Sequence, residues 1–171
     1  VSPMKDGKWT KYGSPVLEQF EAWEGGAGPG FVGQPCIVKR GDVLWMYYAG
    51  EDADRIGGIG VAYSTDGINF TKSGNNPLIT ATEAYEIGEG GNSHRIQVPT
   101  LIYDEWETNA AKKWKMWYQC DDLNGGRDDI AYAYASDPEG PFTKGGLVWD
   151  TWQLNYGISV FRVGERYLCY A

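Results

Sequence analysis

The sequence has few of the residues that usually build metal centres or nucleic-acid-binding surfaces. It contains three cysteines and one histidine in 171 residues, and the cysteines lack the close spacing typical of metal ligands. Aspartate and glutamate outnumber lysine and arginine by 23 to 15, and a net charge of −8 disfavours binding to nucleic acid or to anionic membranes. No apolar run reaches the length of a transmembrane helix. We therefore expect no metal, no cofactor, no nucleic-acid partner and no membrane partner.

Aromatic residues and glycine, in contrast, are abundant. The chain has 8 Trp, 12 Tyr and 24 Gly, and aromatic residues make up 15 % of it. Aromatic side chains pack well on pleated sheets, and glycine relieves strain in tight turns. No segment shows sustained helical periodicity. A length of 171 residues suits one domain, so the sequence predicts a single all-β domain of many short strands.

A pattern of strand, tight turn and strand recurs along the chain. It is seen in IGVAYSTDGINFTKSGNNPLI, which begins at Ile59, and again in IAYAYASDPEGPFTKGGLVWD, which begins at Ile130. The chain also opens with a related stretch, MKDGKWTKYGSPVL. This pattern belongs to a longer repeat, in which GQPCIVKRGDVLWMYYAGED matches QVPTLIYDEWETNAAKKWKMWYQCDD. A third copy of the longer repeat begins with YGISVFRVGERYLCYA, in which the final Tyr170 and Ala171 match Tyr48 and Ala49. Each full copy contains four strand candidates. A four-stranded antiparallel unit repeated at this length is typical of a β-propeller blade.

We therefore predict an all-β fold, a β-propeller of four-stranded antiparallel blades, with two full and two partial blades in this chain. Residues 1–17 would end one blade, 18–79 and 80–149 would each form a blade, and 150–171 would begin a half blade. The sequence stops at RYLCYA, within an apolar strand candidate that would leave backbone groups unpaired. We expect either that a missing chain segment completes the propeller or that a second copy does so in a homo-oligomer.

The blade segments resemble a known family. LWMYYAGEDADRIGGIGVAYSTDGINFTKSGNNPLI, and VPTLIYDE with WKMWYQCDD and IAYAYASD, are similar to blades of the five-bladed propeller glycoside hydrolases. This group includes the family 43 arabinanases and xylosidases and the invertase-like enzymes of family 32. The resemblance covers nearly the whole chain and rests on residues that build blades. It implies a glycoside hydrolase, or a segment of one, that cleaves an oligosaccharide or polysaccharide with a carboxyl pair near the propeller axis.

The family pattern directs attention to a carboxylate just before the Pro or Cys that begins an inner strand. In this chain Gln34 precedes Pro35, and Gln97 and Val98 precede Pro99. A glutamine can orient a sugar hydroxyl but cannot act as a general acid. We predict substrate-binding roles for Gln34 and Gln97. They also keep open an alternative function, a catalytically silent propeller module that binds glycan or protein through its axial face.

Candidate catalytic acids lie in the connections between blades and at the strand ends. Glu86 lies in the long connection before the second inner strand and recurs as Glu24, while Asp122 follows a second strand and recurs as Asp52. We nominate Glu86 and Asp122 as the carboxyl pair. Their recurrence also fits a structural role, because a catalytic residue need not appear in every blade. For Asp52 and Asp122 that role would be a turn cap that accepts backbone N–H groups.

The remaining candidates are residues that could contact a sugar. His94 and Arg95 lie just before the second inner strand and carry hydrogen-bond donors for a hydroxyl or a carboxylate. Trp23 and Tyr85 occupy matched positions outside the strands, where an exposed ring would stack on a pyranose. His94 could equally be an ordinary loop residue. Because the inner strands of a propeller converge, we expect His94, Arg95 and the two glutamines to face a common pocket.

Overall fold

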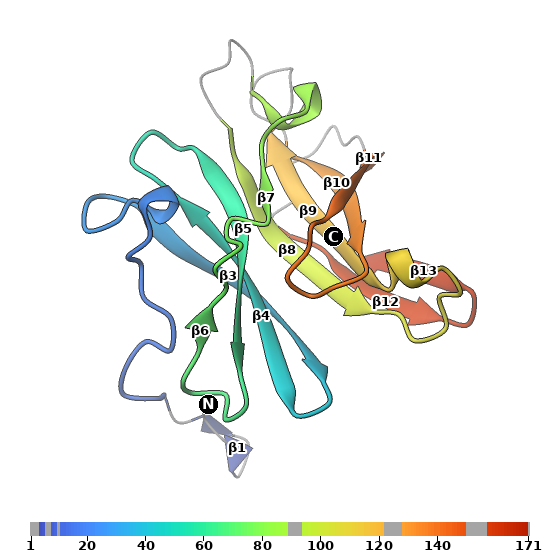
Figure 1. The fold of residues 1–171 in the computed structure, drawn as a ribbon, viewed down its shortest axis with the longest axis horizontal. Helices are drawn as coiled ribbons and strands as arrows, with labels where there is room; N and C mark the ends of the chain where they lie inside the picture. Colours follow the sequence, from blue (N-terminus) through green and yellow to red (C-terminus); the bar gives the residue numbers. More distant parts are fainter. Residues whose placement is uncertain are drawn as a thin grey trace.

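The computed structural model is built almost entirely from antiparallel β-sheets (Figure 1). It describes residues 4–5, 8–9, 11–88, 94–121, 128–149 and 157–170. Within these ranges there is no α-helix, and none of the helices found there is long and apolar enough to cross a membrane. The helical segments are single 3-10 turns: η1 (Ala22–Glu24), η2 (Ala84–Glu86) and η4 (Ala110–Lys112). The all-β prediction is confirmed for the described residues.

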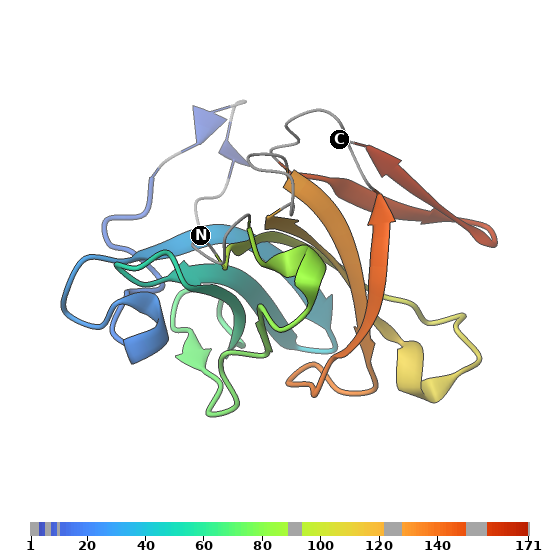
Figure 2. The same ribbon diagram turned by 90° about the horizontal axis from the view of Figure 1, so that it is seen from above.

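The strands form two large sheets and two hairpins (Figures 1 and 2). The first sheet, which we call the first blade, contains β3 (Phe31–Arg40), β4 (Val43–Glu51), β5 (Gly57–Ser64), β6 (Thr71–Lys72) and β7 (Ile79–Thr80). Its strand order is β3-β4-β5-β6, and β7 also pairs with β5. The second blade contains β8 (Ile96–Tyr103), β9 (Trp114–Asp121), β10 (Asp128–Ala135) and β11 (Thr143–Trp149). The hairpins are β1 (Met4–Lys5) with β2 (Lys8–Trp9), and β12 (Ser159–Val163) with β13 (Arg166–Tyr170).

This strand order matches the order that the repeat predicts. Cys36, Met46 and Ala62 lie in successive strands of the first blade, and their counterparts Thr100, Met116 and Ala133 lie in successive strands of the second. The prediction of four-stranded antiparallel blades is therefore confirmed. The division of the chain at residues 17, 79 and 149 stays a prediction.

The hydrophobic core lies largely between the first and second blades. Tyr47 of β4 is fully buried, its ring lies 6.2 Å from that of Trp114, and its hydroxyl donates to the carbonyl of Pro138 at 2.9 Å. At the inner edge, the Cys36 Sγ accepts a hydrogen bond from the Leu101 N–H at 3.3 Å, and burial raises the pKa of this thiol. Burying large apolar side chains contributes about 1.5–3 kcal/mol each, so the two blades stabilise one another.

The outer edge of the first blade is interrupted between β6 and β7, and the Asn76 side chain fills the gap. Its Oδ1 accepts from the Val61 N–H at 2.8 Å, and its Nδ2 donates to the Val61 carbonyl at 3.0 Å. The amide side chain thus bonds both backbone groups of Val61, whose carbonyl also accepts from the Ser73 N–H at 3.0 Å. Its Nδ2 also lies 3.1 Å from the Tyr48 hydroxyl.

The hairpin β12–β13 corrects the sequence match of the third copy by one residue. Both this hairpin and β3–β4 have two-residue turns, at 164–165 and 41–42, and paired residues flank each turn. Counting from the turns puts Tyr170 at the place of Tyr47, so the match to Tyr48 was wrong. A one-residue shift exchanges the two faces of a strand, so this correction decides which blade a side chain faces.

Replacing Asn76 with alanine should destabilise the first blade, because the Val61 N–H would lose its side-chain acceptor and the Val61 carbonyl would lose one of its two donors. We expect Asn76→Ala to lower the free energy of unfolding by about 2 kcal/mol, whereas the exposed neighbour Asn75→Ala should change it by less than about 0.5 kcal/mol. Urea unfolding followed by Trp fluorescence measures both. Equal effects of the two substitutions would show that the side-chain bridge does not stabilise the sheet.

Candidate functional site

The inner strands of the two blades and of the β12–β13 hairpin converge on a hollow of about 480 Å³. Its lining comes from β3, from β8 and from the start of β12, and includes Gln34, Cys36, Thr100 and Val160. Direct bonds join neighbouring strands there: Gln34 Oε1 accepts from the Val98 N–H at 3.1 Å, and Thr100 Oγ1 donates to the Ile158 carbonyl at 2.5 Å. The hollow therefore lies where the propeller axis is expected.

Matched bulges kink the inner strands next to this hollow. The register with the second strand shifts between Gly33 and Cys36 in β3 and between Gln97 and Thr100 in β8. Gln34 and Val98, the residues before the prolines, have φ of 52° and 49°, a left-handed conformation that is unfavourable for non-glycine residues. Bulges turn side chains away from the strand alternation. They account for the placement of Gln34, whose side chain reaches the neighbouring blade.

A polar cluster joins the two blades near the beginning of β8. Gln97 Nε2 donates to Glu51 Oε2 at 2.8 Å, Gln97 Oε1 accepts from Arg95 at 3.1 Å, and Arg95 Nε lies 3.7 Å from Glu51 Oε2. The Glu51 side chain is 17 % exposed and that of Arg95 is 38 % exposed, so both reach solvent. We call these three residues, Glu51, Arg95 and Gln97, the mouth cluster. They offer a carboxylate acceptor and guanidinium donors at one partly open position.

A second buried amide, that of Gln119, lies next to the mouth cluster. Gln119 of β9 is the register partner of Gln97 and is 5 % exposed. Its Oε1 is buried and has no hydrogen-bond partner in the part of the chain that the structure describes. Such a group is destabilising unless a donor reaches it, which marks this end of β9 as a place of polar rather than apolar packing.

The structure brings some predicted site residues together and separates others. Gln97 and Arg95 share the mouth cluster, and Gln34 lines the adjoining hollow. His94 contributes its backbone, since its carbonyl accepts from the Gly57 N–H at 2.9 Å. Asp122 lies outside the described residues. Its first-blade counterpart, Asp52, accepts the N–H groups of residues 54 and 56, which confirms the predicted turn cap in that blade.

The two aromatic candidates, Trp23 and Tyr85, lie in packed surroundings. The Trp23 ring stacks at 5.8 Å on Tyr48, and its Nε1 donates to Glu21 at 2.7 Å. A Cβ at Gly50 would lie 2.3 Å from this ring, so the glycine lets Trp23 rest directly on the sheet. Tyr85 is half-buried and packs against the core between the blades. Their predicted stacking on sugar stays a prediction, and their contacts favour a structural role.

Glu86 is fully buried in the connection between the blades, and its hydrogen-bonding capacity is used there. Its Oε1 accepts from the Tyr118 hydroxyl at 2.7 Å, and its Oε2 accepts from two backbone N–H groups and pairs with Lys144. Burial and the bond to Glu86 raise the pKa of Tyr118, so this hydroxyl stays a donor. The catalytic role of Glu86 stays a prediction, and these contacts favour a structural one.

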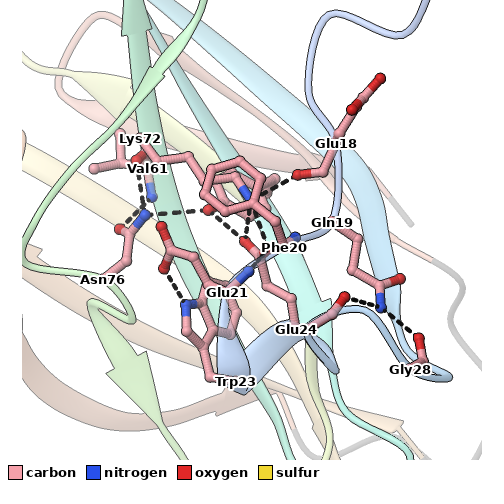
Figure 3. Close-up of polar contacts among 12 residues, drawn as sticks. Glu18, Gln19, Phe20, Glu21, Trp23, Glu24, Gly28, Val61, Lys72 and Asn76 are labelled. Atoms are coloured by element: carbon pink, nitrogen blue, oxygen red, sulfur yellow. Dashed lines mark hydrogen bonds and ion pairs between the residues drawn. The ribbon is translucent and has the colours of Figure 1, made fainter.

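The first blade repeats this arrangement around Glu24 (Figure 3). The carboxylate is fully buried, accepts from the Tyr48 hydroxyl at 2.8 Å and from Lys72 Nζ at 2.7 Å, and accepts backbone N–H groups at 3.1 Å. In both blades the glutamate closes a capping box on a 3-10 turn. The same buried carboxylate therefore anchors the connection into each inner strand.

Sequence reasoning passed over Glu51, which the structure places in the mouth cluster. The available signal was the repeat itself, because Glu51 and Asp121 both end a second strand. The contact with Arg95 and Gln97 arises from the packing of two blades. Glu51 and Gln97 are 46 residues apart in the sequence, so no local pattern links them.

Comparison with known proteins supports the fold and leaves the activity open. No family model matches the sequence, and no curated protein does. Solved structures do match. An exo-β-1,3-galactanase from Clostridium thermocellum is 20 % identical over 85 % of this chain and 32 % of its own, with a TM-score of 0.57. The Bacillus subtilis arabinanase is 18 % identical over 74 % of this chain and 42 % of its own, with a TM-score of 0.53. A family 117 glycoside hydrolase from Zobellia galactanivorans is 19 % identical over 75 % of this chain and 43 % of its own, with a TM-score of 0.53.

The fold is that of a glycoside hydrolase propeller. At these identities the matches show the fold alone. This chain spans 32–43 % of the length of those three structures, so what it shares with them is part of a propeller.

Glu86→Gln tests whether this carboxylate is structural, because the substitution removes the buried charge that pairs with the partly exposed Lys144. We expect a loss of about 3 kcal/mol in the free energy of unfolding, measured by urea denaturation. Glu105→Gln is the control: it breaks the exposed ion pair with Arg40 and should cost less than about 1 kcal/mol. A Glu86→Gln protein as stable as the wild type would contradict the structural role and favour the catalytic one.

Proposed function

We propose that this chain is part of a carbohydrate-active β-propeller that binds a glycan at the mouth cluster and takes part in hydrolysis of a glycosidic bond. The observation that carries the proposal is the carboxylate, guanidinium and amide group held together across two blades beside the axial hollow. Sites in propellers of this architecture form where inner strands from several blades converge. The similar solved structures, a galactanase and an arabinanase among them, support the choice of ligand class.

The chemistry of the mouth cluster suits a sugar hydroxyl pair. Arg95 keeps N–H donors beyond the one that Gln97 accepts, and Glu51 keeps acceptor capacity beyond its bond to Gln97. A vicinal diol presents donors and acceptors in the complementary pattern. The two hydrogen bonds of Gln97, one donated to Glu51 and one accepted from Arg95, fix the orientation of both charged groups before a ligand arrives, which lowers the entropic cost of binding.

Hydrolysis requires a second carboxyl group within reach of the same bond. We propose Asp122 for one of the two positions, because it follows β9 just as Asp52 follows Glu51 at the end of β4. Glu51 is our candidate for the other. A general acid or base of this kind contributes about 10²–10⁴-fold to the rate, so its loss is readily measured. Glu86 is a weaker candidate, given that Tyr118 and Lys144 already occupy its oxygens.

A catalytically silent binding module is the second candidate function. It is favoured by Gln34 and Gln97, amides at inner-strand positions where the resembling family directs attention to an acid. Such a module would bind glycan or protein at the same mouth cluster without cleaving it. The two functions differ in turnover and share the binding residues.

The test combines a hydrolysis assay with a binding assay on the full chain. Galacto-, arabino- and xylo-oligosaccharides are incubated with the wild type and with Glu51→Gln, Asp122→Asn and Arg95→Ala, while reducing ends and calorimetric binding are measured. We expect both acid substitutions to slow hydrolysis by at least about 10²-fold with binding retained, and Arg95→Ala to weaken binding. Arg40→Ala, an exposed arginine at the other end of β3, is the control and should change neither quantity.

The outcomes separate the candidates. Binding without any hydrolysis, lost in Arg95→Ala, would favour the silent module. Hydrolysis that survives all three substitutions would show that the reaction occurs elsewhere. If no sugar is bound or cut, the proposed function is wrong.

A further inference from the structure

A second polar site lies at the end of the second blade away from the mouth cluster. The connection from β8 to β9, residues 104–113, begins where β8 ends, and the mouth cluster lies where β8 begins. At about 3.3 Å per residue, the eight residues of β8 separate the two places by about 25 Å. In Figures 1 and 2 this connection lies beside the turn of the β12–β13 hairpin. Nothing at the mouth cluster reaches it.

Trp106, in this connection, is an exposed aromatic ring on a fixed support. It is 71 % exposed, whereas its backbone N–H donates to Asp104 Oδ1 at 3.1 Å. The Arg162 guanidinium lies 4.9 Å from the Trp106 ring centroid and is itself held at 3.1 Å by Asp104 Oδ1. Asp104 is only 2 % exposed and also accepts from the Tyr167 hydroxyl. The ring is therefore positioned from the backbone and from the guanidinium while much of its surface faces solvent.

A hollow of about 470 Å³ opens beside this ring. It is lined by Trp106, Arg162, Gly164 and Glu165. Gly164 has φ of 61° in the β12–β13 turn, a conformation that favours glycine. Arg162 Nε is buried without a hydrogen-bond partner within the described ranges, and Glu165 is exposed. An aromatic face, an arginine side chain and an exposed carboxylate thus border one cavity.

These surroundings fit a sugar better than an apolar protein surface. Protein docking patches are contiguous and apolar, whereas the other side chains lining this hollow are Arg162 and Glu165, both charged. A pyranose has a C–H face for the ring and hydroxyl groups for the charged rim. Asp104 neutralises Arg162, so Glu165 leaves the hollow negative and disfavours acidic sugars.

We propose that the hollow at Trp106 is a second glycan-binding site, which holds a neutral pyranose of a polysaccharide on the Trp106 ring. The inference rests on the proposed function for its ligand class and on the contacts of Trp106 for its place. Two separate contacts on one chain raise the effective concentration of a polymer at the mouth cluster, while short oligosaccharides occupy one site at a time.

The test uses retardation of the full chain in native gels that contain β-1,3-galactan, arabinan or arabinoxylan, with polygalacturonate as the acidic polymer. We expect a neutral polysaccharide to retard the wild type and Trp106→Ala to raise the dissociation constant about tenfold. Trp149→Ala removes another exposed tryptophan, on β11, and should leave retardation unchanged. Urea midpoints of both variants are compared with the wild type, and Trp106→Phe, which keeps a ring, should bind more tightly than Trp106→Ala.

Calorimetric titration with a trisaccharide separates this inference from the proposed function. Trp106→Ala should bind the trisaccharide at the mouth cluster as the wild type does. Arg95→Ala should lose the binding event at the mouth cluster. If Trp106→Ala is retarded like the wild type while Arg95→Ala loses the trisaccharide, the inference is wrong and the proposed function stands. If Trp106→Ala loses retardation although Arg95→Ala changes nothing, the inference stands and the mouth cluster is not the site. Absence of retardation by every neutral polymer, or equal retardation by polygalacturonate, overturns the inference.

Discussion

The buried carboxylate in the connection between blades is the contact on which the positions of the inner strands depend. Glu86 ties this connection to the second strand through Tyr118 and to the outer strand through Lys144, so one side chain links two strands of the blade. The first blade repeats the contact around Glu24. In each blade the buried carboxylate thus holds the part of the connection around it against the sheet, ahead of the inner strand. A loose connection would leave the residues at its end without fixed positions.

The mouth cluster is a consequence of that placement, since it needs both blades. Glu51 comes from the end of β4, while Arg95 and Gln97 come from the start of β8. The left-handed conformation of Gln34 and Val98 at the two bulges costs about 1–3 kcal/mol each. It persists because packing between the blades holds these residues in place. Strain of this kind beside a polar cluster is typical of binding sites. It connects the stability of the blades with the function proposed for their axial face.

The repeat predicted the fold well because strand order and blade packing follow from patterns along the chain. Cys36, Met46 and Ala62 lie in the predicted strands. The site was harder to predict, because Glu51 meets Gln97 only when two blades pack together. Glu86 could be read in two ways, since recurrence identifies a residue that every blade needs and says nothing about chemistry. Tyr170 was assigned one residue away from its place because a dipeptide match cannot detect a shift in strand register.

Side-chain NMR can show directly whether the mouth cluster contacts the sugar. In the 15N-labelled 19.0 kDa protein, the Arg95 Nε–H and the Gln97 side-chain amide report on this cluster without any substitution. During titration with a galacto- or arabino-oligosaccharide, we expect both resonances to shift and saturate together, with one dissociation constant. Saturable binding in which neither resonance moves, while signals elsewhere do, would contradict it.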